Sequence, residues 1–110
     1  NAESEGISTT LKAGFLMKKN ANFVGWEKRY FVIGSNSLTW YKNPGENFPL
    51  GFVSVADILS VNLLPKKAGR RFDIITDDRV LKLMDTTQEG ALQWSKVIGE
   101  LISHVRRGGD

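Results

Sequence analysis

The chain has 110 residues, the length of one domain and enough to bury a core without disulfides. Its hydrophobic content of 41% and charged content of 25% are typical of a globular protein, and no apolar run approaches the roughly 20 residues of a membrane-spanning helix. The absence of cysteine excludes disulfides and thiolate metal sites. That absence fits a reducing compartment as well as others, and the N-terminus shows no signal-peptide features; the expected location is cytoplasmic.

Positive charge is concentrated in two places along the chain. Residues 11–42 contain six lysines and arginines against Glu27 alone, and the segment KKAGRR at 66–71 adds four more. Residues 72–90 are net negative. A single lysine usually marks a solvated face, but two clusters in a chain with separated charges favour an anionic partner.

Short runs rich in aromatic and β-branched residues, separated by turn residues, predict seven strands. These runs cover residues 10–19, 26–33, 38–42, 50–55, 59–64, 71–76 and 79–84. The second and third runs are joined at GSNS as a hairpin, and Asp77 with Asp78 turns the last hairpin.

The end of the chain changes to a helical period. An apolar stripe at spacings of three and four passes through Ala91, Trp94, Ile98, Leu101 and Val105. The segment TTQE at 86–89 predicts a capping box, in which Thr86 accepts a backbone N–H and Glu89 reaches back. The helix is expected to be about 18–20 residues long and to bury Trp94 as core.

This order of elements predicts an α+β, mainly β fold. We expect a seven-stranded bent antiparallel barrel, or a sandwich of two near-orthogonal sheets, capped by one C-terminal amphipathic α-helix. Residues 10–106 are expected to form the domain, between a flexible segment at 1–9 and a flexible tail at 107–110.

Three motifs and the helix together resemble one known family. GFLMKK at 14–19, WEKRYFVI at 26–33 and LTWYK at 38–42, followed by a helix with one central tryptophan, resemble the pleckstrin-homology (PH) domain. The matching positions are Gly14, Leu16, Lys18, Trp26, Arg29, Tyr30, Phe31, Ile33, Leu38, Tyr41, Lys42 and Trp94. The resemblance implies a bent barrel that is not an enzyme and binds phosphoinositide head groups at its open mouth, or a protein partner.

Strand alternation assigns the charges of the first hairpin to two faces. If the apolar residues of the first two strands point inward, Lys18, Glu27 and Arg29 point toward the mouth. The resemblance implies a head-group site there, made by Lys18 and Arg29 with help from Tyr41 and Lys42. Glu27 stands where the family pattern has a cation, and we expect it to repel phosphate or to pair with Arg29 or Lys18.

An outer-face site is the alternative to the mouth. Lys19 and Lys28 point outward from the same hairpin, away from Glu27. The resemblance implies that some family members bind lipid between this surface and the loop joining strands five and six. That loop and the start of the next strand carry Lys66, Lys67, Arg70 and Arg71.

The loop NANFVG at 20–25 carries two apolar residues, Phe23 and Val24. Either they fold back onto the barrel rim, or they insert shallowly between lipid head groups and add apolar burial to the charge attraction.

The expected function is that of a non-catalytic module, peripherally recruited to membranes through phosphoinositides or other anionic phospholipids. A protein-interaction or autoregulatory module with little lipid specificity is the alternative. No catalytic residue, metal site or cofactor is expected, because the single histidine, His104, suits the helix end. Nucleic acid is not expected as a partner, since the net charge is only +3, and the isolated domain is expected to be a monomer.

Overall fold

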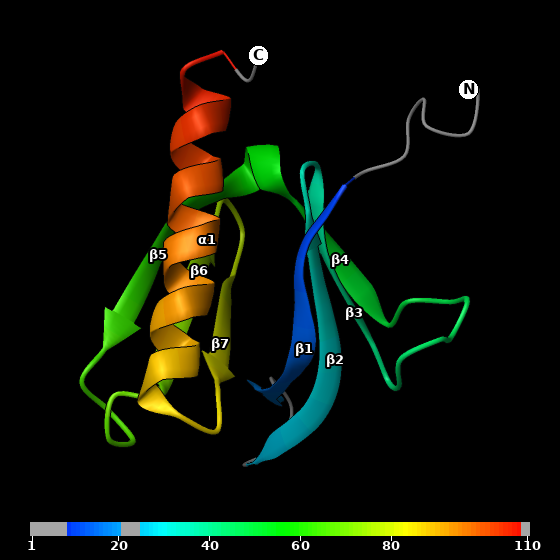
Figure 1. The fold of residues 1–110 in the computed structure, drawn as a ribbon, viewed down its shortest axis with the longest axis vertical. Coiled ribbons are helices and arrows are strands. Elements are labelled where there is room, and N and C mark those ends of the chain that lie inside the picture. The colour runs from blue at the N-terminus through cyan, green and yellow to red at the C-terminus, as the bar shows by residue number, and fades with distance from the viewer. Residues whose placement is uncertain (1–8, 21–24, 109–110) are drawn as a thin grey trace.

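The computed structural model describes residues 9–20 and 25–108. Within these residues, seven strands and a short 3-10 helix precede one long α-helix (Figure 1). The elements are β1 (Thr10–Lys19), β2 (Trp26–Gly34), β3 (Ser37–Tyr41), β4 (Gly51–Ser54), η2 (Val55–Asp57), β5 (Ile58–Leu64), β6 (Arg71–Thr76), β7 (Val80–Met84) and α1 (Gln88–Arg106). The predicted fold class is confirmed.

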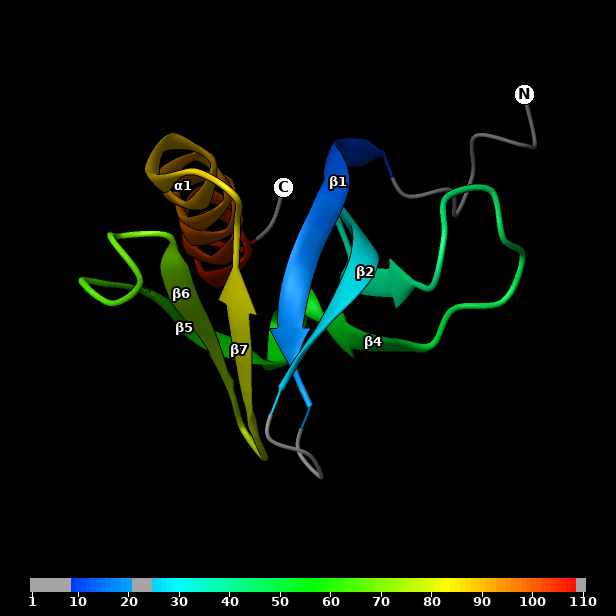
Figure 2. The ribbon, with the colours of Figure 1, turned by 90° about the horizontal axis from the view of Figure 1, so that it is seen from below.

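The strands form one continuous antiparallel sheet that bends into two halves. Their order across the sheet is β4-β3-β2-β1-β7-β6-β5. The halves meet where β1 pairs with β7, at Met17 with Met84 and Lys18 with Leu83, a much shorter ladder than that between β1 and β2. Figure 2 shows the two halves as the arms of a V, with α1 lying in its opening.

Helix α1 closes the opening of the V with its apolar stripe. Its buried residues are Ala91, Trp94, Ile98, Leu101 and Ile102. Trp94 packs against β1, where a Cβ added at Gly14 would lie 3.8 Å from its ring, and the Lys12 ammonium lies 5.3 Å from the ring centre. Trp94 is therefore a core residue, as predicted. Each large side chain buried in this way stabilises the fold by roughly 1.5–3 kcal/mol.

The start of α1 corrects the predicted capping box by one residue. The cap is Thr87, whose hydroxyl accepts the Gly90 N–H at 2.9 Å. Thr86 does not cap the helix, because its own N–H donates to the Asp85 carboxylate at 2.6 Å and is held outside the first turn. Glu89 lies in the first turn, where its charge suits the positive end of the helix dipole.

Helix α1 ends at Arg106, and Arg107, the first residue of the expected tail, is its C-cap. Arg107 and Gly108 donate their N–H groups to carbonyls of the final turn. The remaining residues of the two expected flexible ends, 1–8 and 109–110, lie outside the described residues.

We expect Gly51→Ala to destabilise the fold by roughly 1–3 kcal/mol, since overpacking forces a well-packed core to shift. The ring of buried Trp40 lies directly on Gly51, and an added Cβ would fall 2.5 Å from its Cζ2 atom. Gly99→Ala is the matched control, because its Cβ would meet Val61 at an ordinary 3.6 Å within a helix. That variant should be unchanged or more stable by up to about 1 kcal/mol. Urea denaturation of both variants tests the pair, and equal losses would contradict this packing.

Candidate functional site

The first hairpin places its charged residues on two opposite faces. Leu16 and Phe31 are buried, so residues two or four positions away from them on the same strand also point to the inner side of the bend. Lys18 is in register with Glu27, and Leu16 with Arg29. The inward positions of Lys18, Glu27 and Arg29 therefore agree with the predicted alternation.

A tryptophan and two cations mark the inner end of the hairpin, which we call the mouth. The Lys18 ammonium and the Arg79 guanidinium each lie 5.6 Å from the centre of the Trp40 ring. Arg79 also donates to the Phe52 carbonyl at 3.2 Å and so connects β7's turn with β4. Sequence reasoning missed Arg79, because nothing local to the Asp-Asp turn shows that it reaches Trp40.

Glu27 pairs with Arg29 rather than with Lys18. Their side chains are 3.2 Å apart and are 40% and 22% exposed, respectively. Arg29 also donates to the Lys28 carbonyl at 2.8 Å. An ion pair this exposed contributes at most about 1 kcal/mol to the stability of the fold, but it directs Arg29, one of the expected phosphate ligands, toward a carboxylate.

The electrostatic environment of Lys18 is positive. Burial lowers the pKa of Lys18, and the Arg79 charge lowers it further, while Glu27 raises it and Arg29 lowers it. The charged form of Lys18 is therefore less favourable than in water, and a bound anion would relieve that repulsion.

The structure does not bring both predicted helpers to the mouth. Tyr41 is in register with Tyr30 on the outer face, where it lines a hollow of about 170 Å³ with Val32 and Thr39. Trp40, its neighbour along β3, takes the inward position. The assignment of Tyr41 to the mouth is thus corrected by the register of β3. Lys42 follows the end of β3 and is exposed.

A row of register partners crosses the outer face at the bend of the sheet. Lys28 is in register with Met17, Met17 with Met84, and Met84 with Arg71. The backbone positions of Lys28 and Arg71 therefore lie about 14 Å apart along the sheet, with two methionines between them. Asp73, two residues after Arg71 on β6, points to the same outer face and pairs with Arg71 at 3.2 Å. A hollow of about 40 Å³ beside the row is lined by Phe15, Leu16, Met17, Lys28, Met84 and Thr86.

Aromatic rings hold the cations of this outer face. The Lys28 ammonium lies 4.4 Å from the centre of the Phe15 ring. Lys19 and Arg71 lie 5.5 Å and 5.3 Å from the Trp26 ring. Among the described residues Lys19 and Lys28 form no ion pair, so their N–H groups stay available for an anion, whereas Arg71 is also paired with Asp73.

The β5–β6 loop adds cations next to Arg71. The Arg70 side chain donates to the Lys67 carbonyl at 2.9 Å, and the Arg70 carbonyl accepts the Asp85 N–H at 2.9 Å. These bonds connect the loop to the segment that leads into α1. Lys66 and Lys67 are exposed on it. The outer-face residues predicted from sequence thus come from the first hairpin, β6 and this loop.

The predicted insertion residues Phe23 and Val24 lie outside the described residues.

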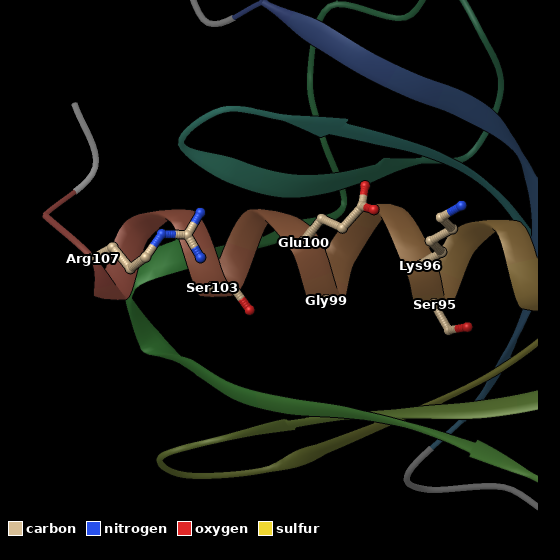
Figure 3. A pocket seen from close by; sticks show the side chains of 6 residues that line it. All are labelled: Ser95, Lys96, Gly99, Glu100, Ser103 and Arg107. Atoms are coloured by element: carbon tan, nitrogen blue, oxygen red, sulfur yellow. The ribbon is translucent and has the colours of Figure 1, made fainter.

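A separate hollow of about 500 Å³ follows the exposed side of α1. Figure 3 shows Ser95 and Ser103 on one flank of the helix and Lys96 and Glu100 on the other. Its charged side chains are of both signs and all come from α1 and its C-cap. This surface has no convergent set of cations and is not a candidate anion site.

Within residues 9–20 and 25–108, no group of three or more histidine, aspartate or glutamate side chains could hold a metal ion. No helix in the same residues has the length and apolar character needed to cross a bilayer.

A family model for the PH domain matches residues 10–103. The chain belongs to the PH family. PH domains are generally non-catalytic modules.

The chain is 31% identical over 86 residues to a RAC family serine/threonine-protein kinase homolog of Dictyostelium discoideum, covering 77% of this chain and 19% of that protein. It is 27% identical over 110 residues to Rho GTPase-activating protein 22 of Mus musculus, covering 87% and 16%. The chain therefore spans about a fifth or less of these relatives.

Solved PH domains share the fold. The C-terminal PH domain of pleckstrin, in complex with D-myo-Ins(1,2,3,5,6)P5, superposes with a TM-score of 0.78 at 24% identity, covering 87% of this chain and 98% of that one. The PH domain of Slm1, in complex with inositol-4-phosphate, also gives 0.78, at 17% identity with 86% and 96% covered.

We expect Arg79→Gln to raise the pKa of Lys18 toward its ordinary value of 10.5, because a neighbouring positive charge is removed. Glu27→Gln should move the same pKa further down. NMR titration of the lysine side chains measures both shifts, and shifts of the same sign in the two variants would contradict the arrangement.

Because folding lowers the pKa of Lys18, the folded state binds fewer protons than the unfolded chain at pH values between the lowered pKa and 10.5. Stability should therefore rise with pH between the lowered pKa and that value.

Proposed function

We propose that this PH domain recruits the protein that carries it to anionic membrane surfaces, by binding a phosphoinositide or another anionic phospholipid without catalysis. The observation that carries the proposal is the set of cations on the outer face, where Lys19, Lys28 and Arg71 lie over aromatic rings. The solved relatives that bind inositol phosphates support the same ligand class. Such a domain would act from the cytoplasm, as a peripheral and reversible anchor.

The outer face suits a phosphorylated head group for two reasons. Its cations come from three separate parts of the chain, so they can approach several phosphate oxygens from different sides. Its methionine floor and small apolar hollow lie between them and could pack against the ring or glycerol of the lipid. Each basic residue near an anionic surface contributes about 1 kcal/mol to binding.

The mouth is the competing location for the head group. Lys18 and Arg79 supply cations there, but Glu27 already engages Arg29. A phosphate entering the mouth would have to displace that carboxylate or accept its repulsion. We therefore propose the outer face as the main site.

A protein-interaction or autoregulatory role with little lipid specificity is the second candidate. The Glu27–Arg29 pair favours it, because a mouth carrying both charges fits a polar protein surface better than a polyphosphate. The domain itself is proposed to be a monomer in isolation under either function.

Charge reversal at the outer face should strongly weaken vesicle binding. Lys28→Glu combined with Lys67→Glu is expected to weaken binding to phosphoinositide vesicles by at least about tenfold, since each reversal replaces an attraction with a repulsion. Arg29→Ala should stay near the unmodified protein. Co-sedimentation with vesicles, at low and physiological salt, measures the change.

A matched control keeps the total charge equal. Lys96→Glu combined with Arg107→Glu makes the same change in net charge on α1 and its C-cap, away from both candidate sites, and should retain most of the binding. Loss of binding in Arg29→Ala alone would move the site to the mouth. Equal loss in both double variants would mean that net charge, rather than a site, attracts the membrane. Absence of binding by the unmodified protein would favour the protein-interaction function.

A further inference from the structure

Exposed apolar side chains gather on one part of the surface. Among the described residues, Phe48 is 82% exposed, Phe52 61% and Leu50 54%, although each would ordinarily be buried. All three belong to five consecutive residues at the end of the β3–β4 loop and the start of β4, which we call the β4 apolar segment (residues 48–52). Contiguous exposed apolar side chains of this kind mark an interaction site.

The β4 apolar segment continues an aromatic strip on the outer face of the first half-sheet. Phe15 meets Tyr30 edge to face at 5.3 Å between ring centres, and Tyr30 is in register with Tyr41. In the next row, Thr39 is in register with Phe52. The strip therefore runs across four strands, from the ring that holds Lys28 to the free edge of the sheet.

The charge of this strip is one-sided. Along β1, β2 and β3, the described residues that point outward include Lys19 and Lys28 but no carboxylate. Acids lie beside both ends of the strip: Asp73 pairs with Arg71 next to the lysine end, and at the far end Glu46 bonds to Asn43 within the loop. A hollow that Phe52 shares is lined also by Asp57, Asp77 and Asp78. Attraction to an anion thus acts at the lysine end, where Arg71 neutralises Asp73, while the far end contributes its exposed apolar side chains.

We propose that the β4 apolar segment is a second membrane-contacting element, whose phenylalanines enter the head-group region of an anionic bilayer when the lysine end binds lipid. The inference rests on the proposed function and deepens it. Outward positions of β1, β2 and β3 that carry lysines and no carboxylate complement an anionic surface, whereas a second copy of the same face would bring like charges together. Aromatic side chains, including tyrosines, are favoured at the boundary between head groups and acyl chains.

The absence of cysteine from the chain allows a direct test. Phe48→Cys carries the only thiol and can be labelled with an environment-sensitive fluorophore. Leu63→Cys is the matched control, because Leu63 is also an exposed large hydrophobic but lies on β5, at the opposite edge of the sheet. Vesicles of phosphatidylcholine, phosphatidylserine and phosphatidylinositol bisphosphate should shift the emission at position 48 to the blue and expose it to nitroxide-lipid quenching. The label at position 63 should stay unchanged.

A pair of unlabelled variants measures the contribution to binding. Phe48→Ser should weaken vesicle partitioning by about tenfold, as expected for an exposed phenylalanine that becomes buried on binding. Leu63→Ser should bind like the unmodified chain. Thermal unfolding without vesicles should be alike for both variants, because both side chains are exposed in the free domain.

The outcomes separate this inference from the proposed function. Binding by the unmodified chain with no spectral shift at position 48, and with Phe48→Ser unaffected, would overturn the inference alone. A concentration-dependent shift in the absence of vesicles would mean that a second copy covers the segment, which also overturns it. Absence of vesicle binding by the unmodified chain would overturn the proposed function, and this inference with it.

Discussion

The short ladder between β1 and β7 is the contact on which both candidate sites depend. It pairs Met17 with Met84 and Lys18 with Leu83, and through these positions it joins the two halves of the sheet. Because neighbouring residues of a strand point to opposite faces, this ladder directs Lys18 to the mouth and Met17 to the outer row. A slip of one residue would exchange the two surfaces and expose the core.

One hairpin therefore offers two surfaces with different electrostatics. On the inner side, Glu27 engages Arg29, and Lys18 is partly desolvated beside Arg79, so the cations there are opposed by an acid or by each other. On the outer side, Lys19 and Lys28 rest on rings with no carboxylate partner among the described residues, and only Arg71 is paired with an acid, Asp73. The outer side also continues into exposed apolar residues of β4, so charge attraction and apolar burial can act on one flat partner.

Much of this arrangement could be predicted from residue periods. The period of two in β1 and β2 separated Lys18 and Arg29 from Lys19 and Lys28, and the helical period identified Trp94 as core, because both depend on local geometry. Two predictions that depended on the exact register of a strand or the first residue of the helix were wrong. Tyr41 was assigned to the wrong face and the cap was placed one residue early, since ladder register in β3 and the Asp85 carboxylate decided those positions.

The sequence by itself determined the order of the strands, the capping helix, the PH family and the two groups of basic residues, because short motifs and side-chain periods are properties of neighbouring residues. Only the tertiary structure decided which distant residues meet. Arg79 reaches Trp40, and Arg71 joins the row that begins at Lys28. The β4 apolar segment is left uncovered. These outcomes follow from where the sheet bends and which of its faces α1 covers, and that bend arises from packing among all the strands at once.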